Sequence, residues 1–226
     1  MSDFSRYAVY YAPRPGAFAD LAADWLGWDP VTGAARPQPD LGLDAAAITG
    51  EPRRYGFHGT IKPPFRLADG VGPQDLDAAL GDLAARLAPV TLPGLRMKSL
   101  DGFLALVPEG DTSALGDLAA TVVRDLDPLR APLTGAEIAR RRPERLTERQ
   151  RDLLDQWGYP FVMEEFRFHL TLTDRLPADL AARAQQVLAA HVAPVLPRPF
   201  VIGDLCLFGQ PADGQFRVIH RYALTG

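Results

Sequence analysis

The sequence is poor in cysteine and in long apolar runs. Cys206 is the single cysteine among 226 residues, so an intramolecular disulfide and a cysteine-rich zinc site are both excluded. No apolar run approaches the roughly 18 residues that a membrane-spanning helix needs. Residues 1–12 lack the basic start and apolar stretch of a secretory signal. We therefore expect a protein of the reducing cytoplasm, with no membrane partner.

The sequence also lacks a strong excess of either charge. Lys and Arg number 24 against 28 Asp and Glu, and a net charge of -4 does not favour binding to duplex DNA over a broad basic face. Hydrophobic residues make up 47% of the chain and charged residues 23%, which is typical of a soluble globular protein. The 21 prolines and 20 glycines predict many turns and few long helices.

Hydrophobic periodicity predicts strands and helices mixed along the chain, which indicates the α+β class. The predicted helices are 17–26, 73–87, 112–126, 147–157 and 177–190. The predicted strands are 6–12, 55–61 (ended by the Pro63-Pro64 pair), a hairpin over 95–107 around Asp101-Gly102, 164–173, and a final pair at 200–208 and 215–224 around a turn at 212–214.

The two halves of the chain carry the same order of features. F-H-G-T at 57–60 is followed by a helix, A-P-V-T-L-P and a hairpin; F-H-L-T at 168–171 is followed by a helix, A-P-V-L-P and a hairpin. This repeat predicts duplicated strand–helix–strand–strand lobes, with cores at about 55–110 and 163–224, in one bilobal domain spanning 1–226. We expect two antiparallel sheets with pseudo-twofold symmetry around a central cleft between the paired F-H-x-T strands.

Each H-x-T sequence places a histidine and a threonine on one face of its strand. Side chains at i and i+2 point the same way, so His58 lies with Thr60. His169 lies with Thr171 for the same reason. Two imidazoles across a cleft can act as base and acid because histidine titrates near neutral pH, and the threonine hydroxyls can donate hydrogen bonds to an anionic centre. The four residues predict phosphodiester cleavage with no metal or other cofactor, since no metal-ligand spacing is present.

With these motifs, the chain resembles the 2H phosphoesterase superfamily, whose hallmark is two H-x-[ST] motifs in a bilobal, duplicated α+β fold. The segments RYAVYYAP, YGFHGTIKPPF and EEFRFHLTLTDRL are similar to a bacterial branch often encoded with phosphonate-utilisation genes. The resemblance implies a metal-independent reaction on a 2′,3′-cyclic, 1″,2″-cyclic or 2′–5′ phosphodiester. It also implies that the histidines are the acid and the base, in an order that the sequence leaves open, and that the threonine hydroxyls bind the phosphate.

Lys62 is a candidate for binding the phosphate. It lies four residues beyond His58 and shares the face of His58 if the strand continues that far. Thr173 takes the equivalent position in the second copy, so the two copies differ in charge. Such an asymmetry is one way to make one histidine the acid and the other the base.

Three more residues are candidates for binding the rest of the substrate. Tyr11 and Tyr55 can stack on a base or a ribose, with packing of the first strand as the alternative. Arg167 shares the face of His169 and can hold a second phosphate, with a surface ion pair to Glu165 as the alternative.

Six arginines gather between the two lobes, in an insertion at about 130–157. They are Arg140, Arg141, Arg142, Arg145, Arg149 and Arg151. One interpretation is a solvated helix face balanced by Glu144, Glu148 and Asp152. The other is an anion-attracting flap over the site. A flap that narrows the cleft favours a small, highly charged substrate, such as a phosphorylated ribose cyclic phosphate, over an RNA end.

The sequence thus predicts a phosphoric diester hydrolase that opens a small cyclic phosphodiester. One alternative acts on RNA ends, at 2′,3′-cyclic termini or 2′–5′ linkages; the absence of a basic patch with interleaved aromatics makes this alternative weaker. The other alternative, from a different class, is a binding module that senses a nucleotide or sugar phosphate without turning it over.

Overall fold

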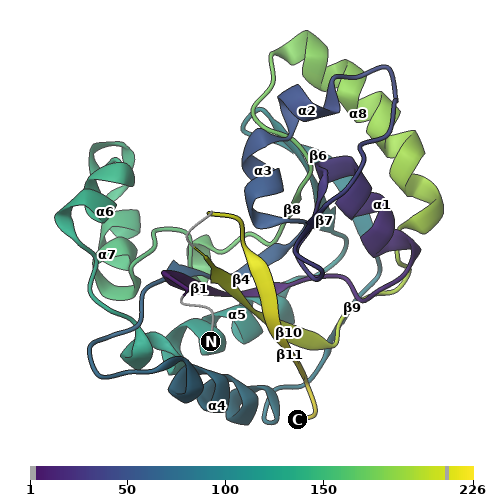
Figure 1. The fold of residues 1–226 in the computed structure, drawn as a ribbon. Helices are drawn as coiled ribbons and strands as arrows, with labels where there is room; N and C mark the ends of the chain where they lie inside the picture. The colour runs from purple at the N-terminus through teal and green to yellow at the C-terminus, as the bar shows by residue number, and fades with distance from the viewer. Residues whose placement is uncertain (1–3, 212–213) are drawn as a thin grey trace.

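An antiparallel sheet flanked by helices forms the centre of the molecule (Figure 1). The structure, a computed structural model, describes residues 4–211 and 214–226. Within these ranges, seven strands pair in the order β11-β10-β1-β4-β8-β7-β6, each antiparallel to its neighbours. They are β1 (Arg6–Tyr11), β4 (Gly59–Phe65), β6 (Leu95–Leu100), β7 (Phe103–Pro108), β8 (Leu170–Thr171), β10 (Asp204–Gln210) and β11 (Arg217–Ala223). The α+β class is therefore confirmed.

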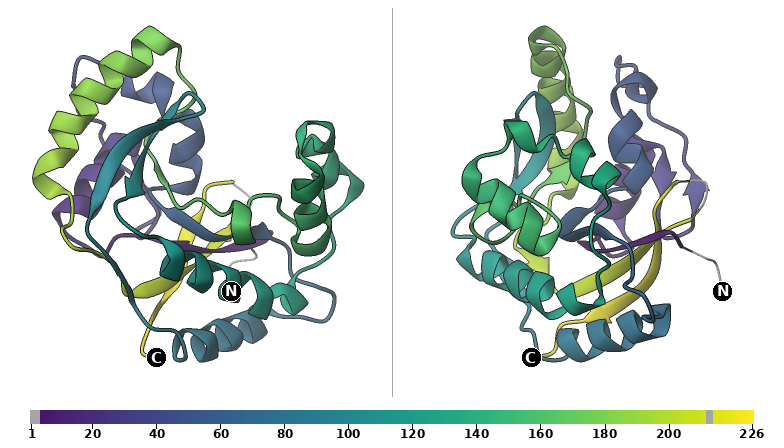
Figure 2. Two further views of the ribbon diagram at one scale, coloured as in Figure 1. Left: turned by 180° about the vertical axis from the view of Figure 1, so that it is seen from behind. Right: turned by 90° about the vertical axis from the view of Figure 1, so that its left-hand side faces the viewer.

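Helices divide between the two ends of this sheet, and one helical arm stands beside it. The helices are α1 (Ala17–Leu26), α2 (Ala45–Ile48), α3 (Gly50–Tyr55), α4 (Pro73–Ala84), α5 (Ser113–Asp125), α6 (Gly135–Arg140), α7 (Glu148–Trp157) and α8 (Ala178–Val192). Helix α8 packs on β6 and β7, whereas α4 packs on β10 and β11 and α5 on β4. Figure 2 shows α6 and α7 standing apart from the sheet as an arm. In the part of the chain that the structure describes, no helix combines the length and apolar character needed to cross a membrane.

The two halves of the sheet meet at a single residue pair. Strands β4 and β8 pair only through Gly59 and Leu170, so the two predicted sheets join into one at this point. The join requires a glycine, because a Cβ at residue 59 would lie 2.3 Å from the Phe168 ring. The strand therefore uses glycine for close approach rather than for an unusual backbone angle.

The two halves of the sequence exchange their hairpins, which corrects the expectation that each lobe is one continuous segment. Hairpin β6–β7 follows the first F-H-x-T strand in the sequence, yet it pairs with β8 of the second half. Hairpin β10–β11 pairs instead with β1, the neighbour of β4. The exchange occurs along β5 (Val90–Leu92) and β9 (Phe200–Ile202), which pair antiparallel to each other. Strand β5 begins at the valine of the first A-P-V segment, and β9 begins after the second A-P-V segment. The repeat in the sequence did not show which hairpin joins which strand.

Most predicted elements are present, but one predicted strand begins and ends at other residues and another is much shorter than predicted. The hairpin turn has the positive φ values expected of Asp101-Gly102, 47° and 92°. The predicted strand 55–61 is wrong at both ends, because α3 extends to residue 55 and β4 continues through Pro63-Pro64. The prolines lie where the register between β1 and β4 shifts, so no regular ladder bond is lost there. The predicted strand 164–173 is reduced to β8, and two residues of the predicted turn, 212 and 213, lie outside the described residues.

The second H-x-T strand has the apolar face that its alternation predicts. Phe168, Leu170 and Leu172 are all buried in the main core. Trp25 of α1 holds the end of this strand, because its indole Nε1 donates a hydrogen bond to the carbonyl of Leu172 at 2.7 Å. His169 and Thr171 therefore alternate onto the opposite, partly exposed side.

Candidate active site

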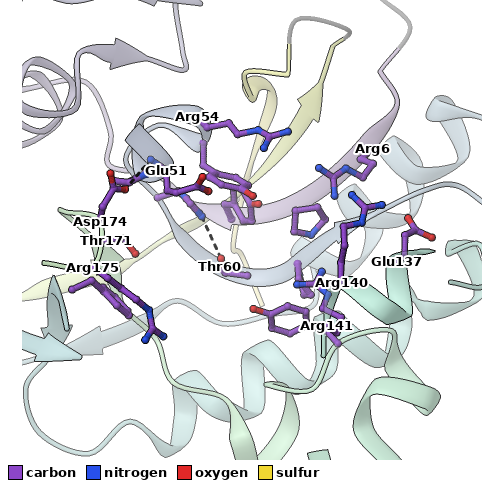
Figure 3. Close-up of a pocket in the computed structure, with 18 of the residues that line it drawn as sticks. Arg6, Glu51, Arg54, Thr60, Glu137, Arg140, Arg141, Thr171, Asp174 and Arg175 are labelled. Atoms are coloured by element: carbon purple, nitrogen blue, oxygen red, sulfur yellow. Dashed lines mark hydrogen bonds between the residues drawn. The ribbon is translucent and has the colours of Figure 1, made fainter. Parts of the chain in front are cut away.

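A cavity of about 650 Å³ lies on the open face of the sheet where its two halves meet (Figure 3). Both H-x-T strands contribute to it, through His58 and Thr60 of the first and Thr171 of the second. The other lining residues are Arg6, Tyr10, Glu51, Pro52, Arg54, Tyr55, Pro63, Pro64, Phe103, Leu133, Glu137, Arg140, Arg141, Tyr159, Thr173, Asp174 and Arg175. The volume suits a small ligand.

The two histidines are held by the same local hydrogen bond. Nδ1 of His58 lies 2.9 Å from the carbonyl of Gly56, and Nδ1 of His169 lies 2.8 Å from the carbonyl of Arg167. A carbonyl can only accept, so each Nδ1 carries the proton and each ring turns Nε2 away from its own backbone. The Thr60 hydroxyl is 3.3 Å from Nε2 of His58. Both rings are therefore oriented for proton transfer at Nε2.

The strand register brings the two motifs face to face. Gly59 is paired with Leu170, and continuing this antiparallel register by one residue places Thr60 opposite His169. In the other direction it places His58 opposite Thr171. Residues opposite each other in an antiparallel pair lie side by side on one face, with Cβ atoms about 4.5 to 5.5 Å apart. His58, Thr60 and Thr171 all line the cavity, whereas His169 is not among the lining residues and lies close enough for its charge to lower the pKa of His58.

His58 is enclosed by aromatic rings. The ring centroid of Tyr10 is 4.0 Å away, that of Tyr55 5.7 Å and that of Phe208 6.4 Å. Burial in this environment lowers the pKa of His58 to about 4; the hydrogen bond to Gly56 opposes the shift and the nearby His169 adds to it. His58 is consequently neutral at pH 7, with a lone pair on Nε2.

Tyr55 lines the cavity, as the sequence predicted for its position. Its ring stacks on Phe216, with the centroids 5.1 Å apart and the planes 21° apart. The two rings form a wall next to His58, and this wall is an apolar surface on which a flat group can pack.

Tyr11 does not line the cavity, so its predicted contact with the substrate is wrong. Its ring is buried in the main core, edge-on to Phe168 and Phe200. Successive residues of a strand face opposite sides, and in β1 it is Tyr10 that pairs with Thr60 on the side of the cavity. Tyr11 is therefore on the predicted strand, but its side chain faces the main core and not the cavity.

Lys62 also lies on the wrong side of its strand for the predicted role. Thr60 is opposite Tyr10, but Lys62 is opposite Val9, so β4 holds one more residue than β1 between these pairs. This β-bulge reverses the alternation of faces, which the sequence alone did not indicate. Lys62 therefore does not share the face of His58, and it is not among the residues that line the main cavity.

The buried Lys62 stabilises the end of α5 instead. Its Nζ donates a hydrogen bond to the carbonyl of Val123 at 3.1 Å, one of the last four carbonyls of a helix that ends at Asp125. Asp127 lies 3.6 Å from the same Nζ. Burial lowers the pKa of Lys62 to about 8, while the charge of Asp127 opposes the shift. The contacts of Lys62 are those of a structural residue.

Arg167 and Thr173 contribute less than their positions suggested. The Arg167 side chain is exposed and is not among the lining residues; its backbone carbonyl holds His169. Thr173 borders the cavity, but its hydroxyl donates to the carbonyl of Asp174 at 2.8 Å and accepts from the backbone N–H of Leu104 at 3.0 Å. Thr173 therefore joins β7 to the chain that follows β8.

The arginine-rich insertion is divided between the two interpretations that its sequence allowed. Arg140 and Arg141 line the cavity, and Arg141 lies over the Tyr159 ring at 4.6 Å. Arg149 instead forms an ion pair with Glu164 on the outside of the arm. Only the start of the arginine run therefore faces the site.

Three further arginines line the cavity and were missed. Arg6 lies at the start of β1, Arg54 near the end of α3, and Arg175 just after β8. Each lies outside the arginine-rich insertion, and no spacing pattern links them. Their convergence depends on how the strands pair, which is a property of the tertiary structure.

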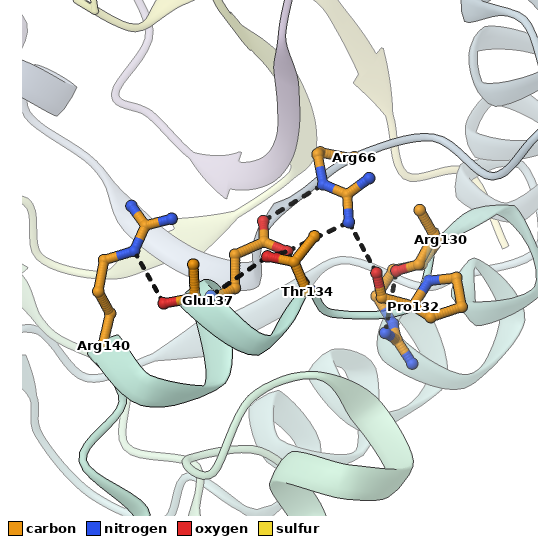
Figure 4. A network of polar contacts seen from close by, with 8 residues as sticks. Arg66, Arg130, Pro132, Thr134, Glu137 and Arg140 are labelled. Carbon is orange, nitrogen blue, oxygen red and sulfur yellow. Dashed lines mark hydrogen bonds and ion pairs between the residues drawn. The ribbon is translucent and has the colours of Figure 1, made fainter.

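Of the acidic residues at the cavity, Glu137 and Asp174 are already occupied by hydrogen bonds, whereas Glu51 is exposed. Glu137 accepts two hydrogen bonds from Arg66, at 3.3 and 3.1 Å, and one from the backbone N–H of Thr134 (Figure 4). These bonds, led by those from Arg66, lower the pKa of Glu137 to about 2. Asp174 accepts from the backbone N–H groups of Gly50 and Glu51 at the start of α3. Positive charge consequently predominates at the cavity. Across residues 4–211 and 214–226, no three His, Cys, Asp or Glu side chains converge as a metal site would require.

Comparisons with known proteins match most of the chain to one family and to two curated relatives. Residues 60–217 match the family described as "Protein of unknown function (DUF1045)". A ribose 1,5-bisphosphate phosphokinase PhnN from Janthinobacterium sp. (strain Marseille) is 38% identical over 222 residues, covering 93% of this chain and 48% of the relative. A protein of the same name from Laribacter hongkongensis (strain HLHK9) is 36% identical over 219 residues, covering 92% and 49%. The chain spans about half the length of these curated relatives.

Solved structures provide more distant matches. TT0787 of Thermus thermophilus superposes with a TM-score of 0.48 at 16% identity, covering 98% of each chain. E. coli LigT complexed with 3′-AMP superposes with a TM-score of 0.46 at 15% identity, covering 99% of this chain and all of LigT.

Proposed function

Starting from the fact that the chain belongs to the DUF1045 family, a family of unknown function, we propose that it is a phosphodiesterase of the 2H type. The observation that carries the proposal is the pairing of two H-x-T strands, in which Gly59 and Leu170 are in register and both histidines are held through Nδ1. Two oriented imidazoles and two hydroxyls on neighbouring strands can supply a base, an acid and hydrogen-bond donors for a phosphoryl group.

We assign the base to His58 and the acid to His169. A group with a pKa of about 4 is protonated in only about one molecule in a thousand at pH 7, so His58 is a poor proton donor there and is ready to accept. Nε2 of His58 takes a proton from water as the water oxygen bonds to phosphorus. The bond from phosphorus to the ring oxygen breaks, and protonated His169 delivers its Nε2 proton to that oxygen. The product is a phosphomonoester with a free hydroxyl.

Thr60 and Thr171 bind the phosphoryl oxygens in this scheme. In the free enzyme the Thr60 hydroxyl donates to Nε2 of His58, which occupies the lone pair that the reaction needs. A substrate phosphoryl oxygen is a stronger, charged acceptor, so the hydroxyl turns to it and releases Nε2 for the water. The reaction itself requires no metal.

The substrate we favour is a small cyclic phosphodiester, specifically a phosphorylated ribose cyclic phosphate. The volume of the cavity and its surplus of arginines support a small, highly charged ligand. The curated relatives carry the name of a kinase of ribose 1,5-bisphosphate. Opening the 1,2-cyclic phosphate of ribose 5-phosphate at the O2 side leaves phosphate on O1 and O5, which is ribose 1,5-bisphosphate. In the longer relatives, the half that resembles this chain would supply the kinase with its substrate.

The test is release of a phosphomonoester from a panel of cyclic phosphodiesters in excess EDTA. The panel holds 5-phosphoribose 1,2-cyclic phosphate, a nucleoside 2′,3′-cyclic phosphate and a 2′–5′ dinucleotide. We expect turnover of the first in EDTA, and its loss in both His58→Ala and His169→Ala. Turnover that needs added metal would contradict the mechanism, and preference for a nucleotide would point to RNA ends. Tight binding without turnover of any member would point to a sensor.

A further inference from the structure

A second hollow of about 500 Å³ adjoins the cavity at the end away from Thr171. Arg6, Arg54, Glu137 and Arg140 line both spaces, so these side chains form the boundary between them. In Figure 3, Arg6 and Arg140 lie at one end of the pocket, Arg175 and Thr171 at the other, and Thr60 between the two ends. The space next to the histidines therefore continues past a group of arginines.

The three boundary arginines are tethered through Nε to neutral acceptors. Nε of Arg6 donates to Oε1 of Gln210 at 2.7 Å, and Nε of Arg54 donates to the carbonyl of Gly214 at 3.3 Å. Nε of Arg140 donates to a carbonyl of its own helix at 3.3 Å. Such tethers orient each guanidinium without neutralising it, and they leave the terminal N–H groups for a ligand.

No carboxylate within the described residues forms an ion pair with these three arginines. Glu137 lines both spaces, but both its oxygens accept from Arg66 (Figure 4), and Glu51 lines the main cavity alone. The Glu137–Arg66 pair is neutral as a unit. The boundary therefore keeps three positive charges, from β1, α3 and α6, and none of them forms an ion pair with a residue that the structure describes.

We propose that Arg6, Arg54 and Arg140 form a second anion site, which binds a phosphomonoester carried by the same substrate whose diester lies at the histidines. The proposal rests on the phosphodiesterase function above and specifies its substrate class, namely a cyclic phosphodiester with a separate terminal phosphate. Guanidinium groups bind phosphate oxygens through paired N–H donors, and three of them match a dianion better than the single charge of a diester. The neutral rim of the hollow, which includes Ser5, Gln210 and Pro211, offers no continuing basic track for a polynucleotide.

The direct test compares two substrates that differ only in the terminal phosphate. These are ribose 1,2-cyclic phosphate with and without a 5-phosphate, assayed with wild type, Arg54→Gln and Arg140→Gln. For the phosphorylated substrate we expect KM to rise about 10- to 100-fold in each variant with little change in kcat, because a charged hydrogen bond is lost in ground state and transition state alike. For the unphosphorylated substrate we expect KM to change less than about twofold.

Arg145→Gln is the matched control. It removes one positive charge from the same insertion, but Arg145 is exposed and lines neither space. We expect it to leave both KM values unchanged. A KM increase of equal size on both substrates in Arg54→Gln and Arg140→Gln, or an equal effect of Arg145→Gln, would overturn the site.

A binding measurement separates this site from the catalytic proposal. We would titrate ribose 5-phosphate, with ribose as the reference, into wild type, His58→Ala, Arg54→Gln and Arg140→Gln by calorimetry. Binding that persists in His58→Ala and weakens about 10-fold or more in the arginine variants supports the anion site even if no cyclic diester is turned over. Equal affinity in all four proteins would overturn it while leaving the phosphodiesterase function standing.

Discussion

His58 and His169 occupy equivalent positions in the two H-x-T strands, and each is held through Nδ1 by the carbonyl two residues earlier. Their surroundings differ. His58 is packed among Tyr10, Tyr55 and Phe208, whereas the ring contact of His169 within the described residues is Phe103, at 5.6 Å. The orientation of each ring is thus set within its own motif, and the proton affinity of His58 is set by rings brought from other parts of the chain. The duplicated motif therefore lies in two different environments, although each histidine is held by the same hydrogen bond.

The largest expected effect is a difference between the His58 and His169 variants in how their activity depends on the leaving group of the substrate. We expect His58→Ala and His169→Ala each to lower kcat about 100- to 10,000-fold on a ribose cyclic phosphate, the range for loss of a general base or acid. On bis(p-nitrophenyl) phosphate the leaving nitrophenolate needs no proton, so His169→Ala should recover most of its activity while His58→Ala stays inactive. The measurement is steady-state kinetics of both variants on both substrates; the reverse pattern would exchange the roles.

The second test is the pH dependence of kcat/KM in the wild type. A base must be deprotonated to act, and the pKa of His58 is about 4, so we expect activity to hold from pH 7 down to about 5 and to fall tenfold per pH unit below about 4. A histidine at its ordinary pKa would lose activity from about pH 6.5 downward. Tyr55→Ala should move the fall to higher pH, because it admits water to the ring of His58.

Stability must be followed in the same experiment. The folded-state pKa of His58 lies below that of an unfolded histidine, so the unfolded chain binds more protons between about pH 6.5 and 4. The free energy of unfolding therefore decreases as pH falls through this window. Circular dichroism at each pH shows whether a loss of activity reflects titration of the base or unfolding. A fall in activity near pH 6.5 with the protein still folded would contradict the assignment of His58.

A third test addresses the contact between the two motifs. Gly59→Ala places a Cβ at about the position of the Phe168 ring, whose Cζ lies 2.3 Å away, so the ring or a strand must shift. We expect the free energy of unfolding to fall by about 1 to 3 kcal/mol, the usual cost of overpacking a core. Chemical denaturation measures it. Gly116→Ala, where the added Cβ meets nothing within 4 Å, is the matched control and should not destabilise the protein.

The smallest effect on catalysis is expected for Lys62. Lys62→Met removes the donor to the Val123 carbonyl at the end of α5, which should lower the free energy of unfolding by about 1 to 3 kcal/mol. We expect kcat and KM to change less than about twofold, since the side chain lies away from the cavity. A large fall in kcat with unchanged stability would contradict the structural role and indicate that Lys62 acts in the active site.

The comparison of the two strands also shows what could be predicted and why. The placement of Thr60 and Thr171 at one cavity could be predicted, because strand alternation depends only on the backbone of each strand. Lys62 and Tyr11 were misplaced because a bulge in one case, and the choice of face in the other, depend on the neighbouring strand. The hairpin exchange was missed for a related reason, since both halves contain the same elements and the repeat does not distinguish between partners.

The sequence was sufficient for the α+β class, the duplication, the two H-x-T strands and most helix positions, because these follow from periodicities of 2 and 3.6 residues that each segment carries alone. The low proton affinity of His58, the buried position of Lys62 and the convergence of Arg6, Arg54 and Arg140 required the folded chain. Each of these depends on contacts between residues far apart in sequence, such as Arg6 with Gln210. Desolvation and charge are properties of the assembled surroundings, and no single segment contains them.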